Sequence, residues 1–91
     1  MITAVILLNV DRGQVNHVAQ RIVNMENVTE VFSVSGRYDL VAIVRTKDNE
    51  GIADFVTNDL VSLSGIQSTE TLLAFKAFSN FDLEHMFSIG S

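Results

Sequence analysis

Cysteine is absent from this sequence of 91 residues, which excludes disulfides and thiolate metal sites. Long apolar runs are missing too, since no segment approaches the roughly 18 apolar residues that a membrane-spanning helix requires. Basic residues are scarce: six Lys and Arg are spread along a chain of net charge −5 and pI near 4.7. Because contacts to phosphates need clustered Lys and Arg, we expect no direct binding of nucleic acid.

Motifs for catalysis and cofactor binding are equally scarce. The five glycines are dispersed and form no phosphate-binding loop. The two histidines, His17 and His85, are not paired at metal-ligand spacing and have no cysteine beside them. We therefore predict two surface histidines, no catalytic residue, no metal site and no cofactor. Residues 1–4 lack the basic segment of a signal peptide, so a cytoplasmic location is expected.

The sequence is rich in hydrophobic residues. Hydrophobic residues make up 47% of the chain, with a mean hydropathy of +0.29. The length allows one domain with one core, and a single small domain does not easily bury this much apolar surface. An oligomer is therefore expected.

Hydrophobic periodicity predicts the order βαββαβ. Apolar alternation or runs indicate strands, and apolar residues three and four apart indicate helices. Asp11 followed by Gln14 resembles a helix capping box, and the second helix opens with acidic residues. This order is typical of an α+β, ferredoxin-like fold, with a four-stranded antiparallel sheet and two helices on one face. The expected strands are residues 2–10, 28–35, 38–46 and 66–77, and the expected helices begin at residues 14 and 47 and end near residues 25–27 and 63.

The first and third expected strands are apolar on both faces. In the first strand, Ile6 and Leu8 alternate with Val5 and Leu7. An antiparallel sheet with one solvated face should instead alternate apolar and polar residues. We therefore predict a homodimer in which two copies pack through the sheet face that has no helices.

The most informative segment is a turn between two strand-like runs. It holds Gly36, Tyr38 and Asp39. Gly36 suits a turn that needs positive φ, and Tyr38 offers a broad apolar face with a polar tip. Asp39 must stay solvated or accept a hydrogen bond, because an unpaired buried carboxylate is costly. These residues would serve either a binding site or a plain hairpin turn.

These features resemble the effector-binding domain of the Lrp/AsnC family, also called the regulation-of-amino-acid-metabolism (RAM) domain. Usual family members begin with a helix-turn-helix domain, whereas this chain starts at the first strand, so we expect a stand-alone version without a DNA-binding domain. Residues 1–77 would form the RAM domain, and residues 78–91 a tail that packs on a neighbouring subunit. The resemblance covers essentially the whole chain and rests on three segments: Gly36-Arg37-Tyr38-Asp39-Leu40, Asp48-Asn49-Glu50-Gly51-Ile52 and Gly65-Ile66-Gln67-Ser68-Thr69-Glu70-Thr71.

The resemblance implies a non-enzymatic domain that binds a free amino acid in a cleft between dimers. Asp39 would accept from the α-ammonium, and backbone N–H groups around Gly36 would bind the α-carboxylate. Thr69 and Thr71 lie two apart on a strand, so their hydroxyls share a face. The implied partners are a homodimer that assembles into an octamer-like ring, a free amino acid and full-length Lrp/AsnC-type regulators, with no membrane. The implied ligand-binding residues are Gly36, Tyr38, Asp39, Leu40, Thr69 and Thr71.

Two other function classes stay open at this point. An allosteric ACT-type module shares the βαββαβ order and would place its key glycine near Gly13. A small dimeric α+β-barrel monooxygenase or isomerase needs a histidine or acid in a closed apolar pocket, and neither His17 nor His85 is placed for it.

Overall fold

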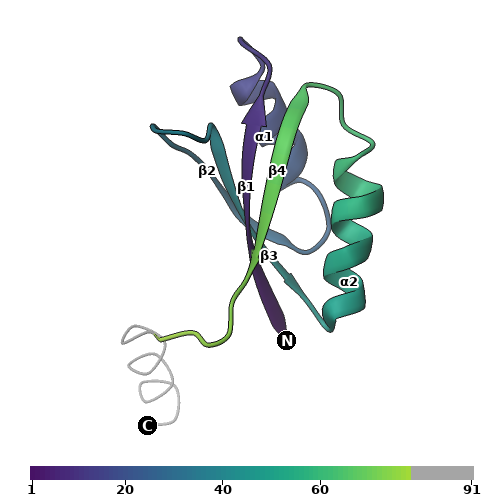
Figure 1. Ribbon diagram of the computed structural model, residues 1–91. Helices are drawn as coiled ribbons and strands as arrows, with labels where there is room; N and C mark the ends of the chain where they lie inside the picture. The colour runs from purple at the N-terminus through teal and green to yellow at the C-terminus, as the bar shows by residue number, and fades with distance from the viewer. Residues whose placement is uncertain (79–91) are drawn as a thin grey trace, which may run out of the picture.

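The computed structural model describes residues 1–78. It confirms the predicted order of strands and helices and the ferredoxin-like architecture (Figure 1). No helix in this described part of the chain is long and apolar enough to cross a membrane. The elements are β1 (Ile2–Val10), α1 (Val15–Val23), β2 (Val28–Ser33), β3 (Leu40–Thr46), α2 (Asn49–Asp54), the π-helix η1 (Phe55–Leu60) and β4 (Ile66–Leu73).

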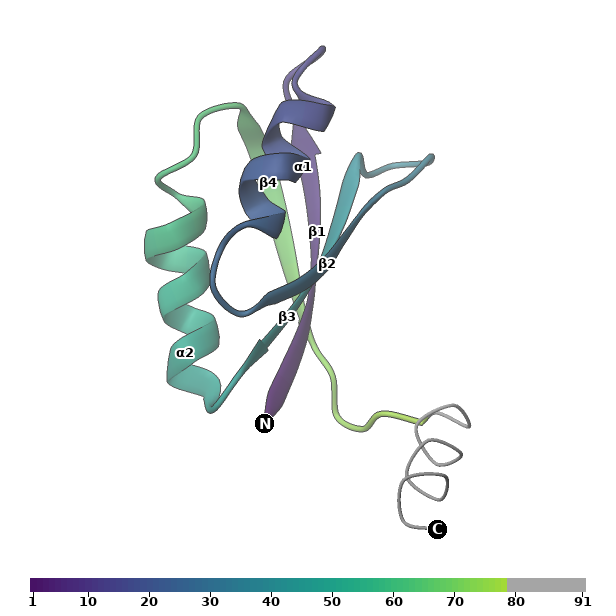
Figure 2. The ribbon, with the colours of Figure 1, turned by 180° about the vertical axis from the view of Figure 1, so that it is seen from behind.

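The four strands form one antiparallel sheet in the order β2-β3-β1-β4. β4 is therefore an edge strand, bonded only to β1. Both helices lie on the same face of the sheet, as the two opposite views show (Figures 1 and 2). The sheet consequently has a helix-covered face and an open face.

The core lies between the helices and alternate residues of the two central strands. In β1, Ile6 and Leu8 are fully buried, and in β3 Leu40 is buried opposite Leu8. Phe55 is the largest fully buried side chain and comes from the helical layer. The period of two along β1 and the helical period of α1 and α2 thus converge on one apolar layer.

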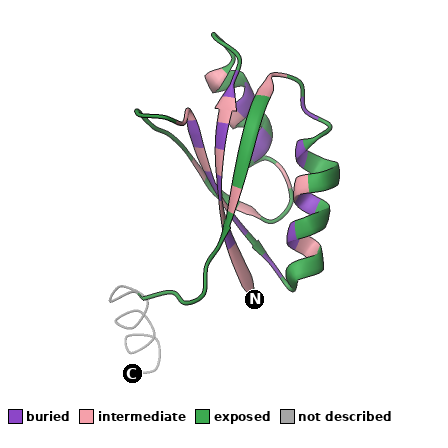
Figure 3. Cartoon of the chain, in the orientation of Figure 1, coloured by how far each residue is buried: buried purple, intermediate pink, exposed green. Residues whose placement is uncertain are grey.

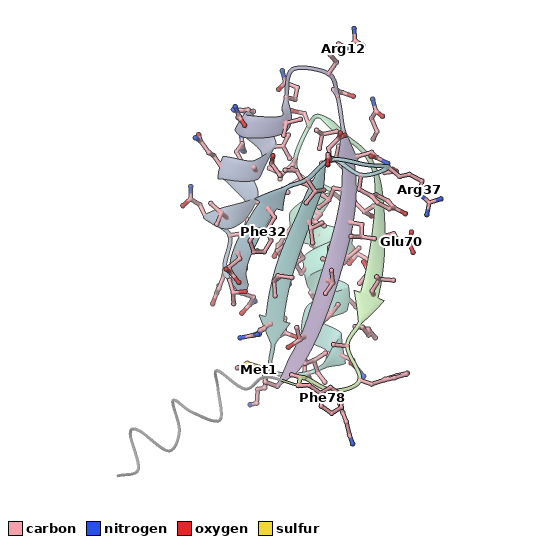
Figure 4. The ribbon with its side chains drawn as sticks, turned by 90° about the vertical axis from the view of Figure 1, so that its left-hand side faces the viewer. Met1, Arg12, Phe32, Arg37, Glu70 and Phe78 are labelled. Atoms are coloured by element: carbon pink, nitrogen blue, oxygen red, sulfur yellow. The ribbon has the colours of Figure 1, made fainter. Side chains whose placement is uncertain are left out.

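The open face is also apolar, as predicted from the first and third strands. Val5 and Leu7 of β1 are half-buried by their neighbours in the sheet, whereas Phe32 and Leu72 are 48% and 45% exposed. Figure 4 looks onto this face, and Figure 3 shows buried and half-buried residues along β1 and mostly exposed residues along β4. Nothing in the described chain covers this surface.

Strand ends differ from the prediction. β2 ends at Ser33 and β3 begins at Leu40, so the connecting turn is residues 34–39 and contains Tyr38 and Asp39. β4 ends at Leu73, not at residue 77, because the chain then leaves the sheet after one bond from Ala74 N–H to Thr3 O. β-Propensity alone does not mark these ends, because apolar residues continue past them.

The helix bounds also differ from the prediction. α1 begins at Val15 without a side-chain cap, so the predicted capping box of Asp11 and Gln14 is wrong. The Asp11 carboxylate instead accepts a hydrogen bond from Gln67 Nε2 at 3.2 Å. The second helix begins at Asn49, capped by the Asp48 carboxylate, which accepts from Gly51 N–H at 2.9 Å. The sequence pattern did not reveal that its second half is π-helical.

Two expectations fall on the C-terminal segment. His85 and almost all of the tail 78–91 lie outside the described residues. Of that tail only Phe78 is described, and its side chain is 88% exposed. The nearby Phe75 is fully exposed. Packing of the tail on another subunit stays a prediction.

Candidate functional site

Gly36 lies at the tip of the hairpin between β2 and β3. Its φ angle is 127°, a conformation that side chains of L-residues rarely adopt, which explains glycine at this position. Apart from Gly36 itself and its two chain neighbours, no heavy atom of the described residues lies within 4 Å of where a Cβ would stand. The backbone of the turn is therefore open to the approach of a ligand or a second chain.

Asp39 ties the base of this turn to the end of β1. Its carboxylate accepts a hydrogen bond from Val10 N–H at 2.9 Å, and its own N–H donates to Leu8 O, also at 2.9 Å. Asp39 O in turn accepts from Val34 N–H at 3.0 Å. The residue is half-buried, and at least one of its two carboxylate oxygens is committed to the fold.

Tyr38 reaches across the sheet to β4. Its hydroxyl donates to the Glu70 carboxylate at 2.6 Å. This hydrogen bond, helped by the negative charge of Glu70, raises the pKa of Tyr38 above its ordinary value of 10.0, and the charge of Arg37 opposes the rise. Glu70 lies opposite Leu7 in the register, so the contact is made on the open face. Figure 4 shows Arg37 at the hairpin tip and Glu70 on β4.

Thr69 and Thr71 share a face, as predicted, but not the face on which Tyr38 meets Glu70. They lie opposite Leu8 and Ile6, whose side chains point into the core. Partners in an antiparallel pair share a face, so both threonines belong to the helix-covered face. In one chain, the sheet thus separates the threonines from the Tyr38–Glu70 contact. Leu40 is fully buried opposite Leu8, where it packs in the core.

A groove, here called the β4 groove, runs between β4 and the helical layer. The helices pack over β3, β1 and β2, so the inner face of β4 stays largely uncovered. Its first hollow, of about 310 Å³, is lined by Val56, Leu60, Val61, Leu63, Ile66, Gln67, Ser68 and Thr69. Its second hollow, of about 370 Å³, is lined by Asn49, Ile52, Ala53, Val56, Thr57, Thr71 and Leu73.

Two features of this region escaped the sequence analysis. Glu70 belongs to the segment Gly65–Thr71, but its pairing with Tyr38 depends on the register of β4 against β1. The role of Asp39 as an acceptor for Val10 N–H depends on the hairpin folding back onto β1. The alternation of Thr69, Glu70 and Thr71 was a usable signal, because it places Glu70 on the face opposite the threonines.

Metal-ligating side chains do not converge in residues 1–78. No group of three His, Asp or Glu side chains in this range is arranged to hold a metal ion. His17 is exposed on α1, as predicted. Gly13, the residue on which the ACT alternative depended, has a φ of 81° in the turn before α1, which accounts for the glycine there.

Comparisons with known proteins show which sequences this chain resembles. The family model described as the Lrp/AsnC ligand binding domain matches residues 3–82. The HTH-type transcriptional regulator FL11 of Pyrococcus furiosus is 36% identical over 76 residues, which cover 82% of this chain and 49% of that protein. The chain thus spans about half the length of the curated relatives that it matches.

Solved structures share the fold. TTHA0845 from Thermus thermophilus superposes with a TM-score of 0.82 at 46% identity, covering 88% of this chain and all of that one. The regulator NMB0573 from Neisseria meningitidis, solved as a complex with L-Met, gives a TM-score of 0.78 at 18% identity. That match covers 87% of this chain and 53% of the regulator.

Proposed function

This chain belongs to the Lrp/AsnC ligand-binding domain family, and on that premise we propose that it is a non-enzymatic module that binds a free amino acid and oligomerises. The family match over residues 3–82 carries this proposal. The L-Met complex of a regulator with the same fold supports the class of ligand. We further propose that the bound state is passed to a partner, such as a full-length regulator with a similar domain.

The proposed site is built from two chains. Gly36, Tyr38 and Asp39 lie at the hairpin, whereas Thr69 and Thr71 face the helical side of the sheet. A ligand that touches both groups therefore needs the hairpin of one copy beside the β4 of another. This arrangement matches a cleft between dimers, with each dimer formed through the open face.

The proposed contacts follow from the chemistry of a zwitterion. Backbone N–H groups around the uncrowded Gly36, together with the hydroxyls of Thr69 and Thr71, are suited to the α-carboxylate. The carboxylates of Asp39 and Glu70 are suited to the α-ammonium, because charge-assisted hydrogen bonds are stronger than neutral ones. Glu70 is added to the predicted set because it is exposed and already accepts a hydrogen bond from Tyr38.

A thermal-shift screen with the twenty amino acids, run beside light-scattering mass measurements, tests the proposal. At least one amino acid is expected to raise the melting temperature, because a ligand that binds only the folded state stabilises it. The mass is expected to exceed 10.0 kDa, the mass of one chain. No shift with any amino acid would contradict the proposed function.

A further inference from the structure

A hollow of about 150 Å³, here called the basic hollow, lies at the end of the sheet where β1 begins and β4 ends. It is lined by Met1, Thr3, Arg45 and residues 74–77. Thr3 and Arg45 lie opposite each other on the open face, because Ala4, the next residue of β1, points into the core. Figure 4 shows Met1 and Phe78 at this end of the molecule. The hollow therefore borders the surface through which two copies are proposed to associate.

The basic hollow combines positive charge with apolar surface. Arg45 and Lys76 are exposed, and among the described residues no Asp or Glu belongs to its lining. They are two of only six Lys and Arg in a chain of net charge −5. Phe75, also in the lining, adds an exposed aromatic ring. A segment that is both acidic and apolar is the complementary occupant, because opposite charges favour docking.

The sequence of this chain contains such a segment directly after the hollow. Residues 79–91 include two acidic residues, Asp82 and Glu84, and no Lys or Arg. They also include five large apolar residues: Phe81, Leu83, Met86, Phe87 and Ile89. The composition of this segment thus complements both the charge and the apolar wall of the hollow.

Chain reach limits which hollow the acidic residues can enter. Six residues span at most about 20 Å, so Glu84 lies no farther than that from Phe78. Two stacked sheets lie about 10 Å apart, whereas the nine residues of β1 span roughly 30 Å. The hollow of a second copy is therefore within reach only where the same ends of the two sheets meet. Phe75 and Phe78 are exposed, so the chain leading to the acidic residues does not pack back onto its own core.

We propose that Asp82 and Glu84 of one copy dock in the basic hollow of a second copy, beside Arg45 and Lys76. The exchange is reciprocal, because in a two-fold dimer each copy contributes one tail and one hollow. This inference rests on the association of two copies in the proposed function, and it adds the residues that decide which ends of the sheets meet. It concerns the assembly and not the bound amino acid.

Two charge-reversed variants of the whole chain test the exchange. The hollow variant carries Arg45→Glu and Lys76→Glu. The tail variant carries Asp82→Lys and Glu84→Lys. In each variant alone, both contacts of the dimer become repulsive, so the dimer dissociation constant should rise at least about tenfold in a light-scattering dilution series.

Mixing the two variants should restore the assembly. In a mixed dimer, the acidic tail of the hollow variant meets an unchanged basic hollow, and the basic tail of the other chain meets an acidic hollow. Both contacts are again attractive. Native mass spectrometry of the mixture should therefore show mixed dimers well above the statistical fraction, while each variant alone dissociates.

A matched control removes the effect of overall charge. Arg12→Glu with Arg21→Glu gives the same net charge as the hollow variant, on exposed residues at and before α1 that do not line the hollow. Mixed with the tail variant, this control restores only one of the two contacts and should form mixed dimers near the statistical fraction. Equal enrichment in both mixtures would show that overall charge drives the pairing, and would overturn the inference.

A chain with all four substitutions of the hollow and the tail distinguishes exchange from docking within one copy. If this chain forms a normal dimer but mixing the two separate variants restores nothing, the tail docks in its own hollow and the inference is wrong. Normal dimers of both separate variants would also overturn it and leave the association through the open face standing. A native protein that is monomeric would count against both.

Discussion

At the hairpin, the Asp39 carboxylate has a clear role in the fold. One oxygen accepts from Val10 N–H, and this bond holds the turn against β1. The sequence indicated that Asp39 needs a donor, but the donor lies 29 residues away and is a backbone group that no motif identifies. Its role toward a ligand stays a prediction.

Two substitutions of Asp39 separate these roles. Asp39→Asn keeps an oxygen for Val10 N–H, so the free energy of unfolding should fall by less than about 1 kcal/mol, while amino-acid affinity falls because the charge-assisted contact is lost. Asp39→Ala leaves the N–H without its acceptor and should cost roughly 1–3 kcal/mol. Chemical denaturation and calorimetry measure the two effects. Asp39→Asn with normal affinity would show that Asp39 does not contact the ligand.

Tyr38 is the only tyrosine of the chain, so its titration can be followed by ultraviolet absorbance. We expect a midpoint above 10.0 in the native protein, because the bond to Glu70 favours the protonated hydroxyl. In Glu70→Gln the midpoint should be lower than in the native protein, since the negative acceptor is gone. Because the folded pKa is raised, the contact stabilises fully below the unfolded pKa and is lost as pH rises through the folded pKa. Equal midpoints in both proteins would contradict the contact.

At the scale of elements, the sequence predicted the order βαββαβ, because β1 and β3 are apolar runs rich in β-branched residues and α1 has a clear period of 3.6 residues. It missed where the elements end. Thr69 and Thr71 share one face, as predicted. The predicted site also included Tyr38, whose contact with Glu70 lies on the opposite face. The register of β4 against β1 decides this, and register is a long-range property that local patterns do not contain.

The cap of α2 gives a test at this scale. Asp48 accepts from Gly51 N–H, so Asp48→Ala should lower the free energy of unfolding by about 0.5–2 kcal/mol. Asp54→Ala, which removes an exposed acid at the end of the same helix, should change it by less than about 0.5 kcal/mol. Denaturant melts of the two variants measure the difference. A similar loss in both would mean that charge, and not capping, is responsible.

At the scale of the whole molecule, the main feature is the uncovered apolar surface of the open face. Val5, Leu7 and Phe32 belong to an apolar surface that no described part of the chain covers. Phe75 and Phe78 are exposed beyond the end of β4. Apolar surface of this extent on a small protein favours association with another copy.

A charge on the open face tests the association. Val5 lies opposite Ile43 and Leu72, so Val5→Asp would bury a carboxylate between two copies. We expect loss of the assembly and a lower melting temperature, since the stability of an obligate dimer is inseparable from its association. Asn16→Asp adds the same charge on exposed α1 and should leave the mass unchanged. An intact assembly in Val5→Asp, measured by light scattering, would move the interface elsewhere.

Native mass spectrometry of the whole chain, with and without each of the twenty amino acids, tests the central claim most directly because it reports assembly and bound ligand together. The account predicts an assembly with an even number of 10.0 kDa chains that retains at least one of these amino acids. A monomer of 10.0 kDa, or an assembly that retains none of the twenty amino acids, would contradict it.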